Sequence, residues 1–444
     1  MWENPIYTFE REVSDGGKIT KKQFHINVTY SAPRNNPDPG IQLVNIFNRV
    51  LKDKAPSKTH ILDVGAAKLR NTLWLLQKGY HVWSVEFPEL KNRLKEAKDK
   101  WEEAERYPNF HKVSFPKDFF KLNGKFDLIM LINVINVMPI PLERYALISL
   151  IHDKLNKKGH LFWHQWRALA ITPDRYTEEN QFIDGYLLQG PNHTFYREYD
   201  RDETHEMLYS LGFQHDKEIP LSKLGGINYS YLFKPTHENL ISNSLNLKNL
   251  IKTKHDPKKA ISNVIVINPL KLYLDELKTI QPGKVDAHRY HLISSRVFYQ
   301  LFSLQLNEPI LENEINEGRG RIDIVYRNKN KEGVFKNLKE LRDIKCPEIF
   351  VECKNYDYNL TTKEYAQLST RLIPKRGMLG FLLCRDKKDA KKVLKHSQDA
   401  NKEDKYIIVL DDQDIIKLAS YKLEDENDER INEFIDNKIK EIID

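Results

Sequence analysis

Cysteine is scarce in this sequence: the 444 residues contain only three, Cys346, Cys353 and Cys384. An odd, small number without CxxC spacing argues against a disulfide framework and against a structural zinc site. No stretch approaches the roughly 18 consecutive apolar residues that a membrane-spanning helix needs. The amino-terminal residues also lack an apolar core of signal-peptide length. These absences predict a cytoplasmic protein without a membrane partner.

The composition is that of a folded protein. Hydrophobic residues make up 40% of the chain and aromatic residues 11%, which is enough to bury real cores. The length suits two or three domains. The formal net charge of +7 favours a polyanionic partner such as nucleic acid, although many lysine-rich proteins bind none.

The character of the chain changes along its length. Residues 1–236 alternate apolar strands with amphipathic helices, which is typical of an α/β fold with a parallel sheet. Residues 237–262 are polar, rich in Asn and Lys, and are predicted to form a linker. Residues 263–424 open with a helix and contain four strand candidates. Residues 425–444 are predicted to form an acidic, solvated helix or tail.

Two strands of the second domain carry charges among apolar residues. The strand RIDIV contains Asp323, and the strand FVECK contains Glu352 and Lys354. Because side chains alternate along a strand, Glu352 and Lys354 share one face. Burying such charges is costly, which indicates a purpose. Asp323 and Glu352 could hold Mg²⁺ (or Mn²⁺) for phosphodiester hydrolysis, while Lys354 orients or deprotonates the attacking water.

The stretch from about residue 286 to residue 412 resembles the PD-(D/E)xK, restriction-endonuclease-like superfamily. In that superfamily a helix precedes a strand with Asp, a strand with Glu-x-Lys, a second helix and further strands. The segments GRGRIDIV, FVECKNY, EYAQLSTRL and GMLGFLLCR follow this order. The resemblance implies a restriction-endonuclease-like α/β/α domain with Asp323, Glu352 and Lys354 as catalytic residues, supported by Gln367.

Two further positions of this resemblance stay open. Asp286, at the start of the opening helix, is the acid available for an additional acidic position. Arg371, one turn after Gln367, either contacts phosphate or is solvated. Since an Asp and an ExK pair recur by chance in lysine-rich proteins, a domain of this fold that only binds nucleic acid is the alternative to an active nuclease.

The segment ILDVGAAKLRNTLWLLQKGYHVWSVEFPE reads as strand, tight turn, helix and strand. Gly65 and the small residues Ala66 and Ala67 let the backbone approach a ligand at the helix N-terminus. Glu86 ends the second strand at the mouth of the sheet, where its carboxylate can accept hydrogen bonds from ribose hydroxyls. The segment therefore predicts a site for a nucleoside cofactor.

Over about residues 40–235 this arrangement resembles the class I S-adenosylmethionine-dependent methyltransferases. Asp63 and Gly65 match the first motif of that family, and Glu86 matches its ribose-binding acid. The resemblance implies a Rossmann-like methyltransferase fold that holds S-adenosylmethionine with Asp63, Gly65, Ala67, Glu86 and Asn133.

The sequence departs from the family in two places. Ala67 and Leu69 replace the usual second and third glycines of the turn, which reshapes the expected cofactor site. After the fourth strand, Asn133 and Asn136 stand where base-amino methyltransferases carry an NPPY-like tetrad, and no Pro-Cys nucleophile occurs. The methyl acceptor is therefore not readable, and a Rossmann-like domain for another nucleotide, or for none, is the alternative.

A nuclease and a methyltransferase in one chain predict a restriction–modification-like or anti-phage enzyme that acts on nucleic acid, with DNA favoured over RNA. In the alternative, only the nuclease acts, and the methyltransferase-like domain is a non-catalytic sensor or nucleic-acid-binding module; the missing tetrad favours this version. A scaffold protein without chemistry is a third interpretation. Recognition could reside in the linker, in the basic loop from Arg327 to Lys345, or in a specificity or defence partner protein, and a homodimer also stays open.

Overall fold

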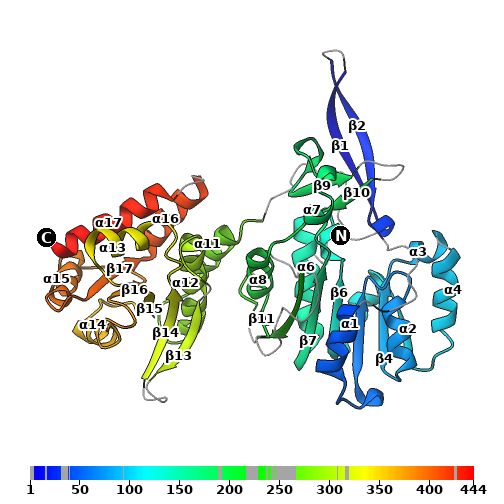
Figure 1. Cartoon of the computed structure of the whole chain (residues 1–444), viewed down its shortest axis with the longest axis horizontal. Coiled ribbons are helices and arrows are strands. Elements are labelled where there is room, and N and C mark those ends of the chain that lie inside the picture. Colours follow the sequence, from blue (N-terminus) through cyan, green and yellow to red (C-terminus); the bar gives the residue numbers. More distant parts are fainter. Residues whose placement is uncertain are drawn as a thin grey trace. The chain divides into compact units, whose positions relative to one another are not determined.

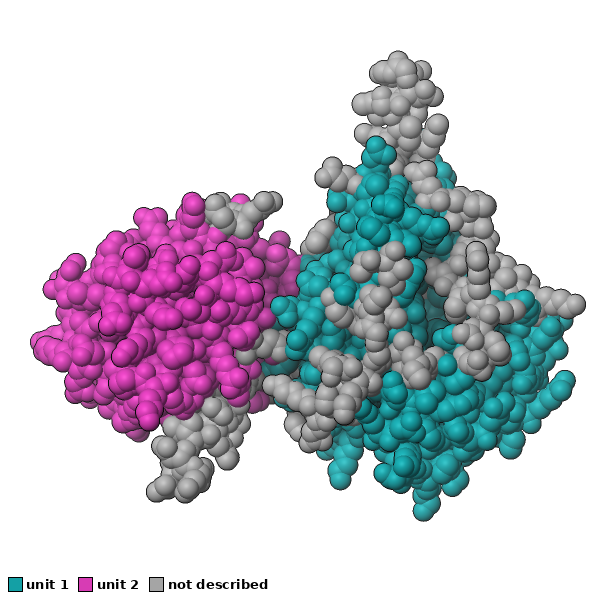
Figure 2. Space-filling view, viewed as in Figure 1, with its two compact units in different colours: residues 1–267 teal, residues 268–444 magenta. Residues whose placement is uncertain are grey.

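The computed structural model describes residues 5–15, 18–31, 39, 41–93, 95–188, 193–216, 229–236, 239–241, 245, 267–307, 309–315, 320–424 and 428–444. The chain divides into two compact units, Met1–Ile267 (unit 1) and Asn268–Asp444 (unit 2), which have different colours in Figure 2. Within the described parts of the chain, no helix combines the length and the apolar character needed to cross a membrane.

Unit 1 is built on a seven-stranded sheet with the strand order β11-β12-β7-β6-β3-β4-β5. Strands β3 to β7 are parallel, whereas β12 is antiparallel to β7 and to β11. The strands are β3 (His60–Val64), β4 (His81–Glu86), β5 (Phe110–Ser114), β6 (Phe126–Ile132), β7 (Leu155–Gln165), β11 (Phe213–His215) and β12 (Tyr229–Pro235).

The parallel strands confirm the predicted Rossmann-like fold. In chain order they are arranged third, second, first, fourth and fifth, as in the doubly wound nucleotide-binding fold. The order reverses between β3 and β6, and ligands of such sheets bind beyond the carboxyl ends of the strands at this point. The apolar run FDLIMLI of β6 fits the centre of the sheet, because both faces of a parallel strand are covered.

Helices cover the unit 1 sheet. One core joins Leu73 of α2 and Trp101 of α4 to Leu128 of β6 and Phe162 of β7. The helices are α1 (Ile41–Ile46), α2 (Arg70–Gln77), α3 (Pro88–Arg93), α4 (Lys95–Ala104), α5 (Lys117–Lys121), α6 (Pro141–Lys154), α7 (Ala168–Ile171) and α8 (Arg201–Ser210).

An accessory layer that the sequence patterns do not predict completes unit 1. It consists of the hairpin β1 (Ile6–Asp15) and β2 (Lys18–Asn27) and of the three-stranded sheet β8 (Gln181–Phe182), β9 (Gly185–Leu188) and β10 (Thr194–Tyr196). Figure 1 shows the hairpin as a long ribbon with β9 and β10 near its base. Phe9 and Ile26 of the hairpin form one apolar cluster with Leu187 and Phe195.

Unit 2 contains a five-stranded sheet in the order β13-β14-β15-β16-β17. The first three strands are antiparallel neighbours, and β15, β16 and β17 are parallel. The four strand candidates of the sequence are confirmed, and β13 is an additional strand. The strands are β13 (Ile310–Ile315), β14 (Gly320–Arg327), β15 (Glu348–Lys354), β16 (Leu379–Cys384) and β17 (Tyr406–Asp411).

Helices lie on both faces of this sheet. Phe298 of α12 packs edge-on against Phe381 of β16, while Leu368 of α14 belongs to a core with Phe350 and Leu382. The helices are α11 (Pro269–Thr279), α12 (Ala287–Phe302), α13 (Val334–Arg342), α14 (Thr362–Ser369), α15 (Ala390–Asn401), α16 (Asp412–Glu424) and α17 (Glu429–Ile443). Membership of the restriction-endonuclease-like superfamily stays a prediction.

The beginning of the predicted linker belongs to unit 1. Of residues 237–262, only 239–241 and 245 are among the described residues. Leu240 and Ile241 are buried, and the Leu240 N–H donates to the Ser210 carbonyl at 2.9 Å. Apolar side chains at these positions therefore anchor the segment to α8, although they form no recognisable stripe in the sequence.

The prediction of a solvated C-terminal helix is wrong. Residues 429–443 are helical, but Ile431, Ile435, Ile439 and Ile442 are buried. Their spacing of three and four residues places them on one helix face, and α17 contacts α13, α15 and α16. The acidic composition describes only the other face.

Candidate functional site

The turn after β3 brings the backbone close to the end of β6. Gly65 has a φ of 71°, and a Cβ at this position would lie 2.6 Å from Cγ2 of Val134. Only glycine fits both requirements. Ala67 (φ 47°) and Leu69 (φ 60°), which stand where the sequence resemblance leads one to expect glycine, also adopt the left-handed conformation. The turn therefore keeps a glycine-like backbone where the usual glycines are replaced, at a cost of about 1–2 kcal/mol per residue.

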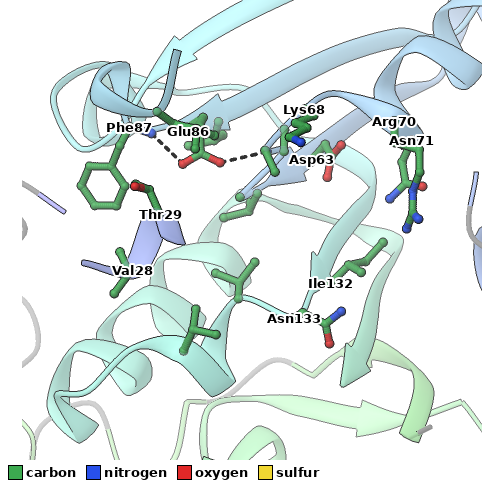
Figure 3. Close-up of a pocket in the computed structure, with 18 of the residues that line it drawn as sticks. Val28, Thr29, Asp63, Lys68, Arg70, Asn71, Glu86, Phe87, Ile132 and Asn133 are labelled. Atoms are coloured by element: carbon green, nitrogen blue, oxygen red, sulfur yellow. Dashed lines mark hydrogen bonds between the residues drawn. The ribbon is translucent and has the colours of Figure 1, made fainter. Parts of the chain in front are cut away.

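Glu86, at the end of β4, is held by this turn. Its Oε2 accepts a hydrogen bond from the Ala67 N–H at 2.9 Å, and its Oε1 accepts one from the Phe87 N–H at 2.9 Å, as Figure 3 shows. Burial raises the pKa of Glu86 to about 7, although the two backbone hydrogen bonds act in the opposite direction. Since each carboxylate oxygen can accept two hydrogen bonds, the ionised group can still accept from a ligand.

Asp63, in β3, ties the strand to α2. Its Oδ2 accepts from the Thr72 hydroxyl at 2.8 Å, and the same hydroxyl lies 2.8 Å from that of Ser84. Asp63 is buried, and this burial raises its pKa to about 6. The carboxyl group thus fixes the start of the helix that follows the turn.

Asn133 links the ends of β6 and β7. It has a φ of 56°. Its Oδ1 accepts from the Trp166 N–H at 2.7 Å, and its backbone N–H donates to the His164 carbonyl at 2.9 Å. The side chain therefore holds the chain in place beside the point where the strand order reverses.

A cavity of about 1420 Å³ brings the predicted cofactor residues together. Figure 3 shows the side chains around the turn and the strand ends. All five residues expected to hold the cofactor line it: Asp63, Gly65, Ala67, Glu86 and Asn133. A nucleoside fits this arrangement, because a carboxylate is fixed at the rim and a glycine turn leaves room for close backbone approach.

The accessory layer supplies an aromatic part of the wall that sequence reasoning missed. Tyr7 comes from the hairpin, and Tyr176, Phe195 and Tyr196 come from the region around β8 to β10. The Tyr7 hydroxyl donates to the buried Glu143 at 2.6 Å. Tyr7 lies more than 160 positions from the other three aromatic residues in the sequence, so no local pattern could have joined it to them.

The aromatic residues at the end of β7 and directly after it divide between core and cavity. Trp166 lines the cavity and is 40% exposed, whereas Trp163 is buried. His164 Nδ1 lies 2.7 Å from the Ser230 hydroxyl, and burial lowers the His164 pKa to about 4. Of these three residues, only Trp166 lines the cavity.

The segment YSAPRNNPDPG lies mostly outside the described residues. Its residue Pro39 lines the cavity, as do Val28 and Thr29 just before it.

A second polar cluster lies in unit 2, on the side of the sheet that faces α14. Glu352 is fully buried. Its Oε2 accepts from Lys354 Nζ at 3.2 Å and from Gln367 Nε2 at 3.2 Å. Lys354 Nζ also donates to Gln367 Oε1 at 3.3 Å. The structure therefore brings together three of the four residues predicted to be catalytic.

The side chain of Arg371 is mostly buried and lies against Glu352, so the alternative of a solvated side chain is wrong. Its Nε lies 3.2 Å from Glu352 Oε1, and its side chain is only 11% exposed. The distance is that of an ion pair, although the hydrogen-bond angles are poor. The sequence could not predict this contact, because it depends on how α14 packs on β15.

The side chain of Asp323 lies outside the described part of the structure, as do residues 316–319, which include the start of the segment GRGRIDIV. The strand register pairs Ile324 with Val351, so the backbone of residue 323 lies across from Glu352. Among the described side chains, no group of three or more His, Cys, Asp or Glu could hold a metal ion. The metal role of Asp323 and Glu352 therefore stays a prediction.

Asp286, the other acid considered, caps the turn before α12. Its Oδ2 accepts from the Gln281 N–H at 2.9 Å. The contact explains its position at the helix start.

Residues 42–218 match a family model described as a methyltransferase domain. No match was found among curated protein sequences. Solved structures similar to this chain include a S-adenosylmethionine-dependent methyltransferase from Clostridium acetobutylicum (16% identity, 45% of this chain and 92% of that chain, TM-score 0.34). The CcbJ methyltransferase from Streptomyces caelestis is 15% identical (47% and 95% covered, TM-score 0.34).

A S-adenosylmethionine-dependent methyltransferase from Bacteroides fragilis, in complex with S-adenosyl-L-homocysteine, is 14% identical, with 52% of this chain and 88% of that chain covered and a TM-score of 0.31. The family match and the strand order agree. Residues 42–218 of unit 1 are thus similar to a methyltransferase domain and lie on a sheet with the strand order of the doubly wound fold.

Proposed function

We propose that unit 1 binds S-adenosylmethionine through Asp63, Gly65, Ala67, Glu86 and Asn133 and transfers its methyl group to a substrate. The observation that carries this proposal is the Glu86 carboxylate, fixed by two backbone N–H groups at the rim of the cavity. Its position at the end of the second parallel strand is that of a ribose-binding acid.

Three of these residues have a defined part in this proposal. Glu86 accepts hydrogen bonds from the ribose hydroxyls, and Gly65 leaves room for the amino-acid part of the cofactor near the start of α2. Asn133 fixes the ends of β6 and β7 beside the reacting methyl group. When bound, S-adenosylmethionine supplies an electrophilic methyl group. The acceptor then occupies the part of the cavity lined by Tyr176, Phe195 and other aromatic residues.

Calorimetric titration with S-adenosylmethionine tests this proposal. We expect Glu86→Ala to weaken binding by about 10- to 100-fold, as for loss of hydrogen bonds to a charged group. Glu89→Ala is the matched control, because Glu89 is exposed and does not line the cavity. Unchanged affinity in Glu86→Ala would rule out the ribose contact, and no binding by the wild-type chain would rule out the cofactor.

We further propose that unit 2 is a nuclease, because a fully buried carboxylate that meets Lys354, Gln367 and Arg371 is expensive to maintain without a function. Asp323 and Glu352 would hold Mg²⁺ or Mn²⁺, which would stabilise charge on the phosphate and activate water. Lys354 would steady the attacking water, and Gln367 would orient Glu352 and Lys354.

Cleavage of plasmid DNA and of single-stranded RNA, with and without Mg²⁺, tests the nuclease. We expect Glu352→Gln to abolish metal-dependent cleavage, while the exposed Glu340→Gln cuts like the wild type. Cleavage that survives in Glu352→Gln would contradict the assignment. The isosteric change limits the effect on folding, which circular dichroism checks.

The two proposed activities together support a restriction–modification-like or anti-phage role, in which one unit marks nucleic acid and the other cuts unmarked nucleic acid. In the alternative, unit 1 is a sensor that binds S-adenosylmethionine without methyl transfer. Incorporation of labelled methyl groups into DNA or RNA separates the two: incorporation favours marking, and binding without incorporation favours the sensor.

A further inference from the structure

The positive charge of this chain is concentrated in one segment of unit 2. Residues 354–395 contain 11 lysine and arginine residues and 4 aspartate and glutamate residues, which gives a net charge of +7. This equals the net charge of the whole chain, so the rest of the sequence is balanced. A partner attracted by the charge of this protein therefore meets it around β15, α14 and α15.

Within this segment, four of the exposed lysines lie around the start of α15. Lys388, Lys391, Lys392 and Lys395 are exposed, and none has an ion-pair partner among the described residues. Their spacing of three, four and seven residues keeps them on one side of the helix and the turn before it. By contrast, Lys387 is paired with Asp411 and Asp414.

Two tyrosines lie in the loop that Lys388 contacts. The rings of Tyr356 and Tyr358 are stacked, with centroids 4.5 Å apart and an angle of 14° between their planes. Tyr358 is 54% exposed, whereas most large apolar side chains of the described structure are buried. Lys388 Nζ donates to the carbonyl of Asp357, between the two tyrosines. The loop also follows directly on Lys354, so the tyrosines lie near the Glu352 cluster.

We propose that Tyr356, Tyr358, Lys388, Lys391 and Lys395 form a tyrosine–lysine surface that binds single-stranded nucleic acid. A base would stack on the open face of Tyr358, and the lysines would contact the phosphates on either side. Bases of a duplex are already stacked on each other, so only an unpaired or extruded base can reach the ring. This inference rests on the nucleic-acid role proposed for unit 2 and adds the form of the strand and the residues that hold it.

Fluorescence anisotropy with labelled oligothymidylate tests the inference on the full chain, in EDTA so that no cleavage occurs. We expect Tyr358→Ala to weaken binding about tenfold or more, since loss of one stacked base corresponds to roughly 5- to 150-fold. The double variant Lys391→Gln/Lys395→Gln should reduce the slope of log affinity against log salt by about 1.4, the value for two single-strand phosphate contacts.

Matched controls are available in the same unit. Leu341→Ala removes a side chain that is 80% exposed on α13, and Lys331→Gln/Lys345→Gln removes two exposed lysines that flank this helix. The segment from Arg327 to Lys345, predicted as a basic loop, thus contains the helix α13 (Val334–Arg342). Both variants should bind like the wild type. The inference is overturned if duplex DNA of the same length binds as tightly as the single strand, if Tyr358→Ala binds unchanged, or if the control lysines matter equally.

The outcome is distinguishable from that of the nuclease proposal. Tyrosine-dependent binding in EDTA without cleavage in Mg²⁺ would contradict the nuclease proposal and support the tyrosine–lysine surface. Metal-dependent cleavage that needs Glu352 but not Tyr358, together with unchanged binding by Tyr358→Ala, would contradict the tyrosine–lysine surface and support the nuclease proposal.

Discussion

The backbone N–H of Ala67 donates a 2.9 Å hydrogen bond to the carboxylate of Glu86. This bond joins the turn after β3 to the acid at the end of β4. Ala67 has a positive φ, so its N–H direction depends on a backbone conformation that alanine adopts reluctantly. The conformation of the turn and the orientation of the proposed ribose acid are therefore coupled.

The raised pKa of Glu86 predicts how cofactor affinity depends on pH. The pKa is about 7 without ligand, and only the ionised carboxylate accepts both ribose hydroxyls. We expect affinity for S-adenosylmethionine to fall as the pH drops below about 7, by up to tenfold per pH unit. Titration calorimetry from pH 5.5 to 8.5 measures this. The variant Glu86→Gln should bind more weakly, and its affinity should no longer change near pH 7. Any remaining change of affinity should lie near pH 6, the pKa of Asp63.

The raised pKa of Glu86 has the opposite effect on the pH dependence of folding stability. A carboxyl group whose pKa is higher in the folded state stabilises the fold fully below its unfolded pKa of about 4.5, and this contribution is lost as the pH rises through about 7. Glu86→Gln should therefore lose stability more slowly than the wild type between pH 4.5 and 7 in denaturant titrations. A parallel pH dependence in both proteins would contradict the assignment of the shift to Glu86.

The strained turn predicts a stabilising substitution. Ala67→Gly removes the cost of a left-handed alanine, about 1–2 kcal/mol, and adds the backbone entropy of glycine, about 0.5–1 kcal/mol. We expect a net gain of about 0.5–1 kcal/mol in the free energy of unfolding, measured with urea. Ala66→Gly is the control, because its φ is not positive, and it should be destabilising. Equal losses in both variants would show that no strain is stored at Ala67.

The contact between Arg371 and Glu352 predicts a link between stability and metal. Arg371→Gln removes a cation 3.2 Å from a buried carboxylate, so we expect a loss of about 1–3 kcal/mol in the absence of metal. If Glu352 is a metal ligand, Mg²⁺ should restore part of this loss and should bind the variant more tightly. Thermal melts with Mg²⁺ or EDTA measure the effect, and a variant that does not respond to Mg²⁺ would count against the metal role.

The buried face of α17 predicts that the C-terminal helix is part of unit 2. Ile435 is fully buried, and Ile435→Ala should cost about 2–5 kcal/mol through lost burial and the cavity left behind. Glu433→Ala changes an exposed residue of the same helix and should have little effect. Similar unfolding curves for the two variants would restore the interpretation of a solvated tail.

Local patterns predicted much of both folds. The alternation of apolar strands and amphipathic helices predicted the parallel sheet of unit 1, because the apolar pattern of each strand or helix can be recognised within a few residues. The turn at Gly65 and the acid at Glu86 were readable for the same reason. In unit 2, the side-chain alternation of a strand predicted that Glu352 and Lys354 share a face, and they lie 3.2 Å apart.

Tertiary structure decided what depends on packing between distant segments. The hairpin β1–β2 packs against Leu187 and Phe195, which lie more than 150 positions further along the chain, so the aromatic wall of the cavity has no local signal. Arg371 reaches Glu352 only because α14 packs on β15. Burial, which sets the pKa of Glu86 and hides one face of α17, is likewise a property of the assembled core. The sequence by itself determined the helices and strands and the residues whose side chains can bind or react. The packing of distant segments determined which of these residues contact one another.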